Sequence, residues 1–189
     1  MSIIAHIQAA VESSPAASLP LHGMTSAAVL IPIFEKEGEP NLLLTIRSQS
    51  VRDHKGQVSF PGGVQDRGES LIETIYRECA EEIGLSRHEI ELFGRISDSV
   101  TITGYRITPF VGLVACPPPS WITNPAEIER ILEIPLRFFS NPAHGRVETF
   151  QLRDGEQMPV YFYDHPEACI WGATARIIHQ LVSLLPPSG

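Results

Sequence analysis

The sequence lacks the features of a membrane or secreted protein. No uninterrupted apolar run reaches the roughly 18 residues that a membrane-spanning helix needs. The amino-terminal stretch MSIIAHIQAAVESS contains no lysine or arginine, so it lacks the basic start of a secretory signal peptide. We therefore predict a cytoplasmic protein with no membrane association.

Cysteine and positive charge are also scarce. The 3 cysteines, Cys79, Cys116 and Cys169, lie far apart, so we expect reduced and buried side chains rather than disulfides or a zinc site. With 14 Lys and Arg against 22 Asp and Glu, the net charge of -8 argues against a nucleic-acid partner, which needs a basic face. An acidic protein that acts on a phosphate ester instead needs local basic groups and metal ions.

The patterns that are present predict one α/β domain over residues 1–189, with an N-terminal helix and linker over 1–23. Further helices are expected at 71–83, 136–139 and 173–185. Apolar and β-branched runs predict strands at 27–34, 42–47, 57–60, 90–97, 105–115, 146–152 and 158–163. The first two and the last two strands are expected to form hairpins, and 127–135 fits either a strand or an irregular edge. We expect a mixed sheet flanked by helices.

The helix at 71–83 has the clearest signals at its ends. Ser70 and Glu73 form a capping-box pattern, and Gly84 stands where a glycine ends a helix. A turn is expected just before it, at Pro61-Gly62-Gly63. The apolar spacing predicts one buried stripe, made by Ile72, Ile75, Cys79 and Ile83.

Carboxylates gather on the same helix, beside that stripe. Glu78 and Glu82 are four residues apart and share one face, and Glu81 flanks it. Like charges at this spacing repel one another unless a cation neutralises them, and oxygen ligands select Mg²⁺ or Mn²⁺. The alternative is a solvated acidic surface. Glu69 and Arg77 are candidates for a pair that holds the preceding loop against the helix.

Basic residues gather just ahead of the glycine turn. They are Arg47, Arg52, His54 and Lys55, in a protein with only 14 Lys and Arg. Arginine is suited to bidentate recognition of phosphate, so these residues are candidate substrate contacts. The alternative is an ordinary basic surface loop.

The spacing of the whole segment over 63–85 resembles the defining box of the Nudix hydrolases, Gx5Ex7REUxEExGU. The matching residues are Gly63, Glu69, Arg77, Glu78, Glu81, Glu82, Gly84 and Leu85, with Cys79 as a mild departure at a position where an aliphatic residue is usual. The resemblance implies an α/β/α sandwich and metal-dependent hydrolysis of a nucleoside diphosphate linked to another group.

The preceding segment is similar to the signature of the coenzyme A pyrophosphatase branch of that family, LLTxRSxxxRxxxGxxxFPGG. It is met from Leu43 to Gly63, and further similarity extends the resemblance over about 27–181. It implies cleavage of coenzyme A, or of an acylated or oxidised form, to 3′,5′-ADP and (acyl-)4′-phosphopantetheine. It also places Gln57, Phe60 and Gly62 in the substrate-selecting segment and its turn.

The resemblance assigns roles that the residues alone leave open. Glu78, Glu81 and Glu82 would hold Mg²⁺ or Mn²⁺, and the general base would be Glu78 or Glu127, although Glu127 also fits a solvated loop acid. Hydrolysis of another dinucleotide, such as ADP-ribose or NADH, is an alternative, and a non-catalytic nucleotide-binding regulator is a weaker one. The apolar N- and C-terminal helices are candidates for a homodimer interface.

Overall fold

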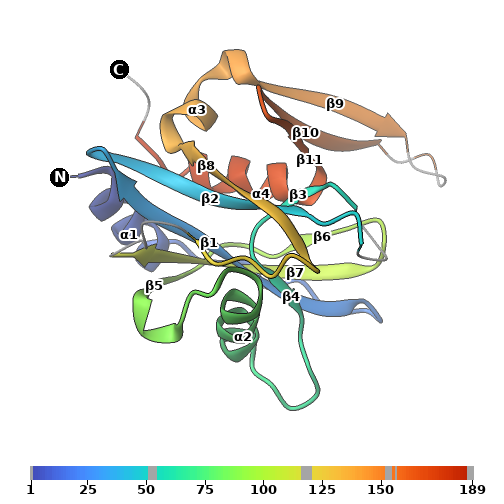
Figure 1. Ribbon diagram of the computed structural model, residues 1–189. Coiled ribbons are helices and arrows are strands. Elements are labelled where there is room, and N and C mark those ends of the chain that lie inside the picture. The colour runs from blue at the N-terminus through green and yellow to red at the C-terminus, as the bar shows by residue number, and fades with distance from the viewer. Residues whose placement is uncertain (1, 51–54, 116–120, 152–154, 156, 187–189) are drawn as a thin grey trace.

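The protein is a layered α/β structure (Figure 1). The computed structural model describes residues 2–50, 55–115, 121–151, 155 and 157–186. A large mixed sheet carries the helix α2 (Leu71–Ile83) on one face. The helices α1 (Ile3–Ser13) and α4 (Gly172–Val182) cover the opposite face. This arrangement confirms the predicted mixed sheet flanked by helices.

The large sheet has eight strands and is organised around β1 (Thr25–Lys36). The C-terminal end of β1, over 33–36, forms the predicted hairpin with β2 (Glu39–Arg47), and residues 25–33 run parallel to β7 (Tyr105–Val114). The N-terminal half of β1 pairs instead with β4 (Gly62–Val64), so a change of partner occurs along one strand. The remaining strands are β3 (Val58–Ser59), β5 (Ile90–Arg95), β6 (Ser99–Val100) and β8 (Ile128–Pro135).

A second sheet of three strands lies beyond α4. It consists of β9 (Gly145–Gln151), β10 (Gln157–His165) and β11 (Ala168–Trp171), and it contains the second predicted hairpin. The short helix α3 (Leu136–Ser140) and a 3-10 turn at Pro142–His144 connect it to β8. Another 3-10 turn, Arg87–Glu89, joins α2 to β5.

Two apolar cores separate the layers. The larger core joins α1, the sheet and α4, and it buries Ile7 and Val11 of α1 together with Ile178 and Leu181 of α4. Much of the apolar face of each terminal helix is thus covered within one chain, and the homodimer interface suggested by the sequence stays a prediction. The smaller core lies under α2. Among the described residues, no helix is long and apolar enough to cross a membrane.

The helix α2 forms as its end signals predict. Ser70 Oγ accepts a hydrogen bond from the Glu73 N–H, while the Glu73 carboxylate accepts one from the Ser70 N–H at 2.7 Å. Gly84 ends the helix with φ 67°, a left-handed conformation that costs glycine little. One member of the predicted stripe is wrong: Ile72 is 43% exposed. The buried residues of the helix include Thr74 and Glu82 besides Ile75, Cys79 and Ile83.

The structure corrects three further expectations. Gly62 and Gly63 belong to a strand paired with β1, because their backbone can approach it where a side chain could not. The last helix ends at Val182 rather than at 185. Cys79 is buried as predicted, whereas Cys169 is exposed on β11, since alternate residues of this strand point away from the core. Cys116 lies outside the described residues.

Candidate active site

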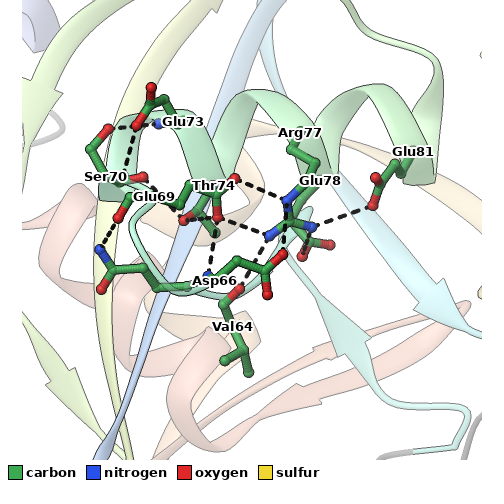
Figure 2. Close-up of polar contacts among 10 residues, drawn as sticks. Val64, Asp66, Glu69, Ser70, Glu73, Thr74, Arg77, Glu78 and Glu81 are labelled. Carbon is green, nitrogen blue, oxygen red and sulfur yellow. Dashed lines mark hydrogen bonds and ion pairs between the residues drawn. The ribbon is translucent and has the colours of Figure 1, made fainter.

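Arg77 organises the acidic face of α2. Its Nε and Nη2 atoms donate to the two oxygens of Glu69 at 3.0 and 3.1 Å, and Nη2 also donates to the Val64 carbonyl at 3.2 Å. Nη1 donates to Glu78 Oε1 at 2.7 Å and to Glu81 Oε2 at 3.4 Å. Figure 2 shows Arg77 between the loop that precedes the helix and the helix carboxylates. The suspected Glu69–Arg77 pair therefore exists and holds the loop against the helix.

The charges in this network are firmly fixed. Hydrogen bonds from Arg77 lower the pKa of Glu69 to about 2, and the hydroxyl of Thr74 adds a further hydrogen bond at 2.8 Å. The same pairing raises the pKa of Arg77. Both groups stay charged at neutral pH, so the loop is anchored through a bidentate contact that lysine would not reproduce.

The glycine strand β4 lies directly against Glu78 and Glu82. The Gly62 N–H donates to Glu82 Oε2 at 3.1 Å. A Cβ on Gly63 would lie 2.3 Å from Glu78 Oε1, and one on Gly62 would lie 2.3 Å from the Ala28 carbonyl oxygen. Only glycine at both positions allows the strand to approach the sheet and the carboxylates together.

Burial makes Glu78 and Glu82 unusual acids. The Glu82 side chain is 2% exposed, and burial raises its pKa to about 8. Burial also raises the pKa of Glu78, against the opposing effect of Arg77. The charges on Glu78 and Glu127 raise the pKa of Glu82 further, and those on Glu81 and Glu127 do the same for Glu78. A positive charge bound beside these two buried carboxyl groups would favour their ionised forms.

Glu81 lies at the outer side of the same face. Its side chain is 53% exposed and its polar partner is Arg77. Arg77 and the Gly62 N–H thus occupy oxygens of Glu78, Glu81 and Glu82. Within the described part of the chain, no three carboxylate, imidazole or thiol groups converge closely enough to enclose an ion. Holding a cation would require at least one of these contacts to open.

The segment ahead of β8 brings Glu127 to this site. The Asn124 N–H donates to the Glu82 carbonyl at 3.1 Å, and Asn124 Nδ2 donates to Glu127 Oε1 at 3.3 Å. The Glu127 carbonyl accepts a hydrogen bond of 2.7 Å from the Ser48 N–H. Glu127 is therefore not a freely solvated loop acid but is half-buried and tied to both α2 and β2.

The structure also gives a role to residues that the sequence did not single out. Asn124 fixes Glu127, and its own side chain accepts from the Ala126 N–H at 3.1 Å in a local turn. Asn124-Pro125 is a turn signal, so the turn was detectable from sequence, but its contact with α2 was not. Gly84 permits that contact, since a Cβ there would meet Ile122 at 3.0 Å.

The candidate substrate segment meets the acidic helix through Arg47. Its Nη1 lies 3.7 Å from Glu82 Oε1. Lys55 is exposed, whereas Gln57 is half-buried and its carbonyl accepts from the Arg47 N–H at 3.0 Å. Phe60 is 2% exposed and packs in the larger core, a position that favours a packing role over contact with substrate. Arg52 and His54 lie outside the described residues.

Comparison with known proteins places this fold and helix in one family. The NUDIX domain matches residues 24–167, so the chain belongs to the Nudix family. Within the family it is similar to the Nudix hydrolases named NudL. The protein of Photorhabdus laumondii is 43% identical over 157 residues, covering 82% of each chain. That of Pectobacterium atrosepticum is 36% identical over 171 residues, covering 88% of this chain and 86% of its own. Both are named uncharacterized Nudix hydrolases.

Solved structures share the fold at lower sequence identity. A MutT NUDIX hydrolase from Burkholderia pseudomallei aligns with a TM-score of 0.51 and 18% identity, covering 82% of this chain and 96% of that one. A Caenorhabditis elegans Ap4A hydrolase, solved as a binary complex, aligns with a TM-score of 0.51 and 17% identity over 60% of this chain and 81% of its own. At this identity the likeness establishes the architecture alone. Together with the curated relatives, it makes the chain a Nudix hydrolase.

Proposed function

We propose that the protein is a divalent-metal-dependent diphosphatase that cleaves coenzyme A, or an acylated or oxidised form, to 3′,5′-ADP and 4′-phosphopantetheine or its derivative. One observation supports this most strongly. Arg47, from the segment that resembles the coenzyme A branch, lies 3.7 Å from the buried Glu82 of the Nudix helix. The expected substrate segment and the expected metal ligand thus meet at one place.

The chemistry of the carboxylate donors suits Mg²⁺ or Mn²⁺ once a contact with Arg77 or Gly62 opens. Glu78 and Glu82 offer hard oxygen ligands whose burial leaves negative charge poorly solvated, and Glu81 becomes a third ligand if it leaves Arg77. A bound divalent cation supplies charge stabilisation for the diphosphate and acidifies a coordinated water. Glu82→Gln should therefore lower kcat by at least about a hundredfold.

The protein's own groups supply orientation and proton transfer. Glu127 Oε1 is fixed by Asn124 at 3.3 Å, which makes Glu127 a positioned candidate for the general base. Glu78, whose pKa is raised by burial, is the other candidate. Arg77 holds Glu78 in place by its contact of 2.7 Å. Replacing Glu127 with Gln while recording kcat against pH distinguishes the two, since only loss of the base removes the acidic limb of the profile, where activity falls as the base is protonated.

The substrate follows from charge as well as resemblance. Coenzyme A carries a 3′-phosphate besides its diphosphate, and the segment from Arg47 to Lys55 carries four basic or imidazole side chains. A hydrolase of ADP-ribose or NADH has no such 3′-phosphate to recognise. The basic segment therefore favours coenzyme A over those dinucleotides.

Product analysis after incubation with coenzyme A and Mn²⁺ tests the proposal. We expect release of 3′,5′-ADP, loss of activity on chelation, and a lower kcat/KM for dephospho-coenzyme A, ADP-ribose and NADH. Lys55→Gln should raise KM for coenzyme A more than for dephospho-coenzyme A, while the matched Lys36→Gln, at the far end of β1, should change neither. Intact coenzyme A and acyl-coenzyme A after prolonged incubation would refute the substrate. Tight nucleotide binding without turnover would support the regulator instead.

A further inference from the structure

Arg47 occupies a position fixed by its backbone. It is the last residue of β2, next to an irregularity in the pairing of β2 with β8 between Ile46 and Arg47. Its N–H donates to the Gln57 carbonyl at 3.0 Å, and its carbonyl accepts from the Gly56 N–H at 3.0 Å. The point from which the side chain reaches Glu82 is therefore set by the sheet.

The side-chain contact of Arg47 is incomplete. A distance of 3.7 Å between Nη1 and Glu82 Oε1 is an ion pair but too long for a hydrogen bond. Its Nε atom is buried and has no hydrogen-bond partner among the described residues. A buried unpaired donor costs free energy, so this guanidinium can gain by making new polar contacts.

Arg77 provides the contrast within the same site. It meets Glu69 in a bidentate contact at 3.0 and 3.1 Å, and its contact with Glu78 is 2.7 Å. Arg77 is therefore held firmly by Glu69 and Glu78, even if its longer contact with Glu81 opens. Arg47 meets the most buried carboxyl group of the helix, that of Glu82, through one long contact, which is the easier of the two to exchange.

Because Glu82 is buried, its ionised form needs a positively charged neighbour even when no ligand is bound. The Glu82 side chain is 2% exposed, so water cannot solvate its charge well. Besides Arg47, the Gly62 N–H supports that carboxylate, while Glu78 and Glu127 oppose its ionisation. A cation that binds Glu82 would take over the part that Arg47 plays and would repel the guanidinium.

We propose that Arg47 is an exchangeable charge partner of Glu82. It faces this carboxyl group in the metal-free protein and gives up the contact when a divalent cation binds, which leaves the guanidinium for the diphosphate of the substrate. The inference rests on the proposed metal-dependent function, which it extends by making Arg47 a competitor of the cation. Arg47 then holds Glu82 in place while no cation is bound, and it contacts the substrate after the cation has bound.

Metal affinity in the absence of substrate tests the exchange. Calorimetric titration of metal-free protein with Mn²⁺ should give a Kd roughly tenfold lower for Arg47→Gln than for the wild type, because the variant has no cation to displace. The matched control is Arg130→Gln, which removes an arginine of β8 that pairs with Glu167 at the surface. Its Kd should stay within about twofold of the wild type.

The outcomes separate the inference from the proposed function. An unchanged or higher Kd for Arg47→Gln would overturn the exchange. Absence of Mn²⁺ binding by wild type and variant alike would overturn the metal site and the exchange with it. Mn²⁺ binding with the expected Kd ratio, but without hydrolysis of coenzyme A, would leave the exchange standing and refute the substrate.

A second measurement needs no charge-removing variant. Titrating Mg²⁺ into the wild-type protein should shift the NMR signal of the Arg47 Nε–H, assigned by its loss in Arg47→Lys. The Arg77 Nε–H signal should move less, since its partner Glu69 precedes the helix. A stationary Arg47 signal at saturating Mg²⁺ would contradict the exchange even if Arg47→Gln failed to fold.

Discussion

Glu82 is the residue in which burial and charge conflict most. Its folded pKa of about 8 exceeds the reference value of 4.5. Between these values the folded protein retains a proton that the unfolded chain has released. The contribution of this proton to the free energy of unfolding is therefore fully present below pH 4.5, and it is lost as the pH rises towards 8. The pKa of Glu69 is lowered to about 2. Its contribution to the free energy of unfolding is therefore lost only as the pH falls below 4.5, outside the range from 4.5 to 8.

We accordingly expect the free energy of unfolding of the metal-free protein to fall as the pH rises from about 5 to about 8. Glu82→Gln removes the ionising group, so its stability should depend less on pH and should exceed that of the wild type at pH 8. Denaturant unfolding in the presence of a chelator at both pH values measures this. Parallel pH profiles for the two proteins would show that Glu82 does not titrate in this range.

The strand β4 and the helix α2 act as one unit. Their relation depends on the close approach of Gly63 to Glu78, which leaves no room for a Cβ. The capping box at Ser70 and the left-handed Gly84 fix the ends of the helix independently of this contact. The helix should therefore form in any variant of β4, while the position of its carboxylates should not survive every such change.

Gly63→Ala tests this dependence. Its Cβ would stand 2.3 Å from Glu78 Oε1, so the carboxylate must move, and we expect kcat to fall about a hundredfold. The neighbouring Val64→Ala is the control, since Val64 is exposed and its loss should change stability by at most about 0.5 kcal/mol. Steady-state kinetics and circular dichroism of both variants measure the two effects. Unchanged kcat in Gly63→Ala would mean that Glu78 need not keep this position.

At the scale of the whole molecule, the buried carboxylate of Asp98 connects the linker that follows α1 to the large sheet. Its carboxylate accepts hydrogen bonds from the Leu19 N–H at 2.9 Å and from Thr108 Oγ1 at 2.8 Å. Arg95 and Arg106 lie 3.7 and 3.9 Å away. Asp98 thereby ties the linker after α1 to the sheet. The larger core likewise packs α1 and α4 against the sheet, while a single domain over 1–189 stays a prediction.

Asp98→Ala should cost about 3 kcal/mol, because it leaves buried donors and two arginines without their acceptor. The amide of Leu19 should exchange with solvent faster as the linker detaches. Hydrogen exchange and denaturant unfolding measure the two effects. Glu129→Ala, at an exposed position of β8, is the control and should leave both unchanged. Equal protection of Leu19 in both variants would rule out the anchoring role.

Sequence signals between neighbouring residues were sufficient to predict the main helix and the two hairpins. The capping box and glycine end predicted the helix at 71–83 to the residue, and apolar and β-branched runs predicted both hairpins. These features depend on neighbours along the chain, so the sequence contains them directly. The spacing from Gly63 to Leu85 likewise identified the Nudix family, which the domain match confirms.

Contacts between distant segments were decided only by the tertiary structure. The exposure of Ile72 and Cys169 depends on what packs over each face, and the strand at Gly62–Val64 forms because β1 offers it a partner. Glu127 reaches α2 through Asn124, and Arg47 faces Glu82. The sequence determined which residues carry charge. The folded chain determined which of those charges are buried together, because burial and distance set their pKa values and partners.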